Sequence, residues 1–146
     1  MIAHHVHLRP TLDGSRVVDV TLDLTAEQLS AGAHAVQRVV DDRYRVAPLE
    51  SADDILAMRE LTSLSDELRS LVVPGAIARL TLTIAGVGRF RMALEDFVGM
   101  ATDDESIARE GDVDALPRVF AIIDGVGDAH ADAMRAALDD TPQLSH

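Results

Sequence analysis

Two segments of alternating apolar and polar residues, joined by a glycine-containing turn, constrain the fold of this chain most. Residues 2–8 and 16–24 alternate with the period of two that is typical of strands, and the turn between them contains Leu-Asp-Gly. A three-residue loop ending at Gly14 places the apolar side chains of both strands on one face. A two-residue loop shifts the pairing by one position and sets polar against apolar side chains. The sequence therefore predicts a β-hairpin with the longer loop, whose register pairs Leu8 with Val18, Val6 with Val20 and His4 with Leu22.

Two amphipathic helices are predicted after the hairpin. The first begins after Thr25, because the Thr25 hydroxyl and Gln28 three positions later form a capping box. The second begins after Ser51, a capping residue, and carries two aspartates in its first turn, where the helix dipole favours carboxylates. We expect this second helix to run to about Val72.

A third strand and two further helices complete the predicted order. Residues 79–84 alternate again and follow Pro-Gly, which indicates a strand. A helix over about 87–101 follows, then an acidic connector over 102–114. The last helix is expected to begin near Pro117, since proline suits a first turn. Residues 140–146 are expected to form a frayed tail.

These elements predict a single α+β domain over residues 1–146, with four helices and three strands in the order ββααβαα. All three strands alternate, so each has one apolar and one polar face. This pattern is typical of an antiparallel or mixed sheet that carries helices on one side and meets water or a partner on the other.

The composition excludes several classes of function. The 146 residues contain no cysteine, which excludes disulfides, thiolate nucleophiles and cysteine-ligated metals. The net charge of −12 repels a phosphate backbone, so we expect no direct nucleic-acid binding. All 13 basic residues are arginine, which indicates codon bias in a GC-rich bacterial genome, or alternatively adaptation to a high-salt cytoplasm.

The apolar runs are too short for a membrane span. The uncharged run over residues 70–78 is far below the roughly 20 residues that a spanning helix needs. No basic region followed by a long apolar segment stands near the first residue. We therefore expect a cytoplasmic protein without a membrane partner.

A histidine-rich strand is the first candidate site. The predicted register places His5 and His7 on the polar face of the hairpin, with Asp19 opposite His7. Two imidazoles two residues apart and a facing carboxylate form a reasonable ligand set for zinc or another divalent metal. The alternative interpretation is the hydrated face of an ordinary half-buried sheet, in which His7 and Asp19 are an exposed cross-strand pair.

His130 is a second histidine of interest, because it interrupts the apolar stripe of the last helix. We interpret it as a core histidine with a satisfied hydrogen bond, the alternative being a site or a pH-sensitive contact. Asp124, Asp128 and Asp132 lie on other faces of that helix and are expected to form a hydrated acidic row.

The second helix predicts a subunit interface. Its main apolar stripe is complete without Ile55 and Met58, which we place on the outer side of the helix. A two-fold contact through this helix would cover both residues, so the sequence predicts a homodimer with Ile55 and Met58 in the interface.

The expected function is a non-catalytic protein-interaction or regulatory domain of unknown partner. No phosphate-binding loop, nucleophile elbow or His-Glu-x-x-His sequence is present. The first alternative is a metal- or small-molecule-binding enzyme that uses His5, His7 and Asp19. The second alternative is an acidic inhibitor of a basic partner.

Overall fold

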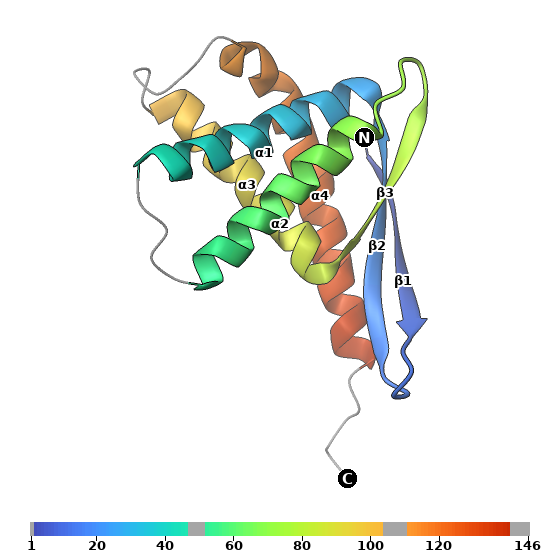
Figure 1. Ribbon diagram of the computed structural model, residues 1–146. Helices are drawn as coiled ribbons and strands as arrows, with labels where there is room; N and C mark the ends of the chain where they lie inside the picture. The colour runs from blue at the N-terminus through green and yellow to red at the C-terminus, as the bar shows by residue number, and fades with distance from the viewer. Residues whose placement is uncertain (1, 47–51, 104–110, 141–146) are drawn as a thin grey trace.

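The residues that the structure describes form a three-stranded sheet and four helices (Figure 1). The computed structural model describes residues 2–46, 52–103 and 111–140. The elements in chain order are β1 (Ala3–Pro10), β2 (Arg16–Thr25), α1 (Ala26–Val46), α2 (Ala52–Ser70), β3 (Ile77–Thr83), α3 (Ile84–Asp103) and α4 (Asp112–Asp140). The predicted α+β class and the order ββααβαα are therefore confirmed.

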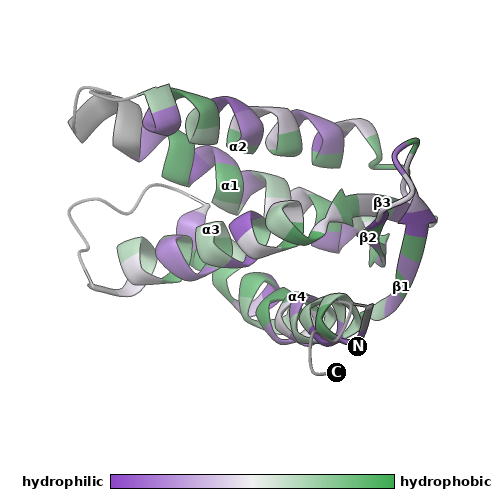
Figure 2. Ribbon diagram, turned by 90° about the horizontal axis from the view of Figure 1, so that it is seen from below, coloured by the Kyte–Doolittle hydropathy of each residue, from purple (hydrophilic) through white to green (hydrophobic). Residues whose placement is uncertain are grey.

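The sheet is antiparallel, with the strand order β1-β2-β3. The hairpin β1–β2 is extended by β3, which reaches the sheet after the helical pair α1–α2. All four helices lie on one side of the sheet (Figure 2). The other side carries the polar residues of the alternating strands, and no helix of the described ranges covers it.

The hairpin has the predicted register and loop. Leu8 lies opposite Val18, Val6 opposite Val20 and His4 opposite Leu22. The loop closes through hydrogen bonds from the Gly14 N–H to the Thr11 carbonyl and from the Thr11 N–H to the Ser15 carbonyl. Gly14 has a φ of +86°, the left-handed conformation that glycine adopts without steric cost.

The first helix begins as predicted. The Thr25 N–H donates to Gln28 Oε1 at 2.9 Å, and the Gln28 N–H donates to Thr25 Oγ1 at 3.2 Å, which completes the capping box. The predicted cap at Ser51 lies outside the described residues. The second helix ends at Ser70, slightly before the predicted Val72.

The last two helices begin earlier than predicted. The α3 helix begins at Ile84 because the Thr83 hydroxyl accepts a hydrogen bond from the Gly86 N–H at 3.1 Å, so β3 also ends before Ile84. The α4 helix begins at Asp112, and Pro117 lies inside it. The prediction of a start near Pro117 was therefore wrong. The first turn of α4 is held by contacts of Asp112 with His34 and Arg38 of α1, which lie far away in the sequence.

The apolar core lies between the helices and the inner face of the sheet. Ile2, which precedes β1, is 5% exposed and packs directly on α4 at Gly125. A Cβ atom at Gly125 would lie 2.8 Å from the Cβ of Ile2, so the close approach requires glycine. Large, fully buried side chains of the core include Leu22, Leu24, Leu29, Leu68, Leu80, Phe90, Leu94, Phe97 and Ile122.

The two residues predicted to form an interface have different environments. Ile55 is 40% exposed, as expected for an outer position. Met58 is 1% exposed and belongs to the core of the protomer, so its placement on the outer side of α2 was wrong. The helix stripe that buries Met58 is wider than the narrow seam assumed from the leucine spacing, as is usual for a helix in a globular core.

Candidate functional site

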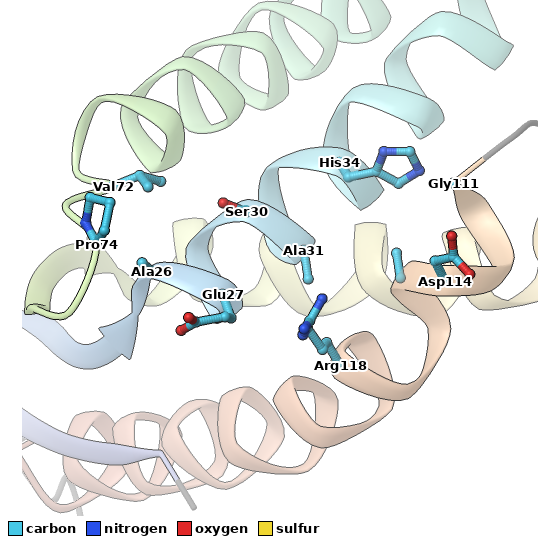
Figure 3. Close-up of a pocket in the computed structure, with 11 residues that line it drawn as sticks. Ala26, Glu27, Ser30, Ala31, His34, Val72, Pro74, Gly111, Asp114 and Arg118 are labelled. Carbon is cyan, nitrogen blue, oxygen red and sulfur yellow. The ribbon is translucent and has the colours of Figure 1, made fainter.

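A cavity of about 490 Å³ lies between the first turns of α1 and of α4 (Figure 3). The connection between α2 and β3 closes one end with Val72 and Pro74. The lining residues are Ala26, Glu27, Ser30, Ala31, His34, Val72, Pro74, Gly111, Asp114, Ala115 and Arg118.

Helical spacing explains how the two helices line this cavity. In each helix the lining positions recur at intervals of three or four residues, so they share one face of that helix. Ala26, Ala31 and Ala115 are nearly buried and form apolar walls. Because their side chains are small, the helices leave space between them where larger residues would fill it.

A buried carboxylate joins the two helices beside the cavity. The Asp112 side chain, at the start of α4, is 1% exposed. The Arg38 Nε of α1 lies 3.2 and 3.1 Å from the two carboxylate oxygens of Asp112, and the Arg38 side chain is 5% exposed. The charges of this pair are thus compensated inside the protein, which a buried carboxylate requires.

The same carboxylate orients His34, a cavity residue. The His34 Nε2 lies 2.6 Å from Asp112 Oδ1. A carboxylate can only accept, so His34 donates through Nε2–H and Nδ1 takes no part in this bond. The ring also packs edge-on against Phe97, with ring centroids 5.7 Å apart. Two contacts therefore hold the imidazole at the cavity wall in one orientation.

Charged and polar side chains from both helices line the cavity. Glu27 and Ser30 belong to α1, whereas Asp114 and Arg118 belong to α4 (Figure 3). Among the described residues, none of these four side chains has an ion pair or a side-chain hydrogen bond. They are therefore available to a bound molecule without breaking contacts within the protein.

The polar face of the sheet brings two of the three predicted metal ligands together. His5 and His7 are both exposed there, with ring centroids 6.3 Å apart. Asp19 lies opposite His7, but its Oδ2 accepts a hydrogen bond from Arg9 Nε at 2.8 Å. In the described part of the chain, no group of three or more His, Asp or Glu side chains is arranged to hold a metal ion. The three-ligand site of His5, His7 and Asp19 stays a prediction.

Hydroxyl groups support His7 on this face. The His7 Nε2 lies 3.2 Å from Thr21 Oγ1, and Thr21 Oγ1 lies 3.1 Å from Thr81 Oγ1. The three side chains come from β1, β2 and β3, so the contacts cross the whole sheet. Thr21 is 8% exposed, so the hydroxyl at the centre of this row of polar groups is largely shielded from water.

The inner-face histidine His4 contacts α4. Its Nε2 lies 2.7 Å from Asp132 Oδ2, and this hydrogen bond holds the pKa of Asp132 below its ordinary value of 3.8. Asp132 thus has a partner on β1 that the prediction of a hydrated acidic row did not include, and its side chain is still 41% exposed.

His130 packs over Gly88 of α3. A Cβ atom at Gly88 would lie 3.2 Å from His130 Nε2. Among the described residues the ring makes no side-chain hydrogen bond. The hydrogen bond that we predicted for a core histidine at this position is therefore not found there.

The α1–α4 cavity was not predicted from the sequence. Its residues lie on two helices whose contact depends on the pairing of Asp112 with Arg38 and His34. The available signal was weak: a single histidine, His34, in an otherwise small and apolar stretch of α1.

Comparison of the chain with models of protein families, with curated proteins and with solved structures gave no match. In the part of the chain that the structure describes, no helix combines the length and the apolar character needed to cross a membrane.

Proposed function

We propose that this protein is a non-catalytic binding domain with a regulatory role, and that the α1–α4 cavity holds a small molecule carrying an amine and a carboxylate. The cavity itself is the observation that carries the proposal. Its volume of about 490 Å³ suits a small organic ligand, since ligand sites typically measure about 300–1,000 Å³.

The charges around the cavity support a zwitterionic ligand. Arg118 offers a guanidinium group to a carboxylate, in the bidentate geometry that arginine favours. Glu27 and Asp114 offer carboxylates to an amine, one from each helix. The alanine walls leave an apolar space for the body of the ligand.

The buried contact beside the cavity supports binding to a preformed site. Asp112 fixes α4 to α1 through Arg38 and also orients His34. A site held in this way loses little conformational freedom when a ligand binds, which favours affinity.

The hydroxyl group of Ser30 lines the cavity one helical turn before His34. In this proposal the Ser30 hydroxyl contributes a hydrogen bond to the bound ligand.

A thermal-shift screen tests the proposal. Free amino acids and related aminocarboxylates are added to the protein, and a ligand of the native state must raise the melting temperature. We expect a hit whose effect is lost in Arg118→Glu and in Ser30→Trp, which fills the cavity from an exposed position.

The matched control is Arg69→Glu, the same change of charge on the exposed face of α2. This variant should keep the full ligand response. Failure of every zwitterion to stabilise the native protein, or equal loss of the response in the control, would contradict the proposed ligand class.

The homodimer expected from the sequence is also a proposal. Because Met58 is buried within the protomer, the outer side of α2 is not the surface that we propose for this contact.

A further inference from the structure

Strand β1 carries two exposed histidines whose imidazoles can bind a metal, but two ligands are too few for a complete site. Within the described residues, β1 is an outer strand of the sheet and pairs with β2 alone (Figure 1). His5 and His7 project from it onto the uncovered face. A stable zinc site requires four ligands, and within the described residues no third protein ligand joins these two.

A second copy of the chain can supply the missing ligands through strand pairing. If two β1 strands pair antiparallel around a two-fold axis at Val6, His5 of each copy lies opposite His7 of the other. Residues directly opposite in antiparallel strands have Cβ atoms about 4.5–5.5 Å apart. The four imidazoles then rise from one patch on the same face of a continuous sheet.

The composition of β1 favours this contact. Each chain carries a net charge of −12, so most surfaces of two copies repel each other. β1 has the sequence AHHVHLRP and contains no acidic residue. Leu8, on its inner face, is 43% exposed and would be covered by the paired strand. An unpaired strand edge also offers backbone groups to an incoming strand.

We propose that two copies of this chain pair along β1 and together hold one zinc-type divalent ion through His5 and His7 of each copy. Four imidazole nitrogens at about 2.0–2.1 Å form the tetrahedral set that zinc prefers. The site is incomplete in one chain, and its formation does not depend on the α1–α4 cavity.

The hydroxyl groups of Thr21 and Thr81 orient His7, one of the proposed metal ligands. Thr21 Oγ1 can accept the Nε2–H of His7 at 3.2 Å, which leaves the Nδ1 of His7 for the metal. Thr21 is in turn held by Thr81. A hydrogen bond to the other ring nitrogen is the usual support of a metal-bound histidine.

Sedimentation of the untagged protein, freed of metal by a chelator, tests the proposal. We expect a monomer that becomes a dimer when zinc is added, saturating at one zinc ion per two chains. With cobalt in place of zinc, the dimer should show the intense visible absorption of tetrahedral cobalt, because the geometry of a site reports its ligands.

The double variant His5→Gln with His7→Gln should remain a folded monomer at every zinc concentration. Both side chains are exposed, so the substitutions leave the core intact. The matched control is His4→Gln, which removes a histidine from the opposite face of the same strand and should keep the zinc response.

Three results would overturn the proposal: zinc bound by a monomer, no change of mass with zinc, or a dimer that persists in the double variant.

Discussion

Replacing Asp112 with alanine removes the only buried carboxylate that the described residues place between α1 and α4. The guanidinium of Arg38, 5% exposed, then stays inside the protein without the acceptor that it contacts at 3.1 and 3.2 Å. Breaking a buried ion pair in this way typically costs about 3–5 kcal/mol. In a domain of this size, 1 kcal/mol corresponds to about 2–4 °C, so the melting temperature should fall by about 6–20 °C.

The measurement is the free energy of unfolding from denaturant titration, together with the melting temperature. Asp128→Ala is the matched control, since Asp128 is an exposed aspartate of the same helix, and it should change the stability by less than about 0.5 kcal/mol. Arg38→Met combined with Asp112→Leu removes both charges and should recover most of the loss, because a buried pair is often replaceable by apolar residues.

A loss below about 1 kcal/mol in Asp112→Ala would refute this reasoning, since it would mean that water reaches Arg38 once the carboxylate is gone. A double variant that is no more stable than Asp112→Ala would equally refute it, because the cost would then not come from breaking the Arg38–Asp112 ion pair.

Two further predictions concern α4. Gly125→Ala should destabilise the protein by about 1–3 kcal/mol, because the new Cβ would lie 2.8 Å from Ile2 Cβ. Gly127→Ala is the control, because the nearest neighbour of its new Cβ would lie 3.8 Å away. This second variant should stabilise the protein by up to about 1 kcal/mol. Thermal melts of the two variants check this, and equal effects would contradict the packing of Ile2 on α4. The hydrogen bond from His4 lowers the pKa of Asp132 below 3.8. This contact therefore stabilises the folded state at pH values above the ordinary pKa of the carboxyl group. The stabilisation is lost as the pH falls through the lowered pKa. His4→Gln should therefore flatten the decline in stability of the native protein below about pH 4, measured by urea unfolding, and an unchanged pH profile would contradict the contact.

Local signals predicted the hairpin and the start of α1 well. The register follows from alternation and from Gly14, all within one short stretch of chain, and the structure has that register. The capping box of Thr25 and Gln28 is equally local and is present as predicted. Such features depend on the geometry of neighbouring residues, which the sequence states directly.

Signals that require distant partners were missed or misplaced. The start of α4 at Asp112 depends on Arg38 and His34, which are separated from it by more than 70 residues. Met58 was placed outside because only the leucine spacing of α2 was considered, whereas tertiary packing buries it fully. For the polar sheet face, the sequence placed His5, His7 and Asp19 correctly but did not reveal that Arg9 holds Asp19.

The sequence by itself determined the class of the fold, the order of its elements and the two faces of its sheet, because periodicity and capping act over a few residues. The tertiary structure alone decided where a cavity opens and which polar groups meet. The cavity between α1 and α4 exists because small side chains face each other across helices that a buried Asp112 holds in place. Which residues face each other across two helices depends on the crossing of those helices, and no pattern along a single helix specifies that crossing.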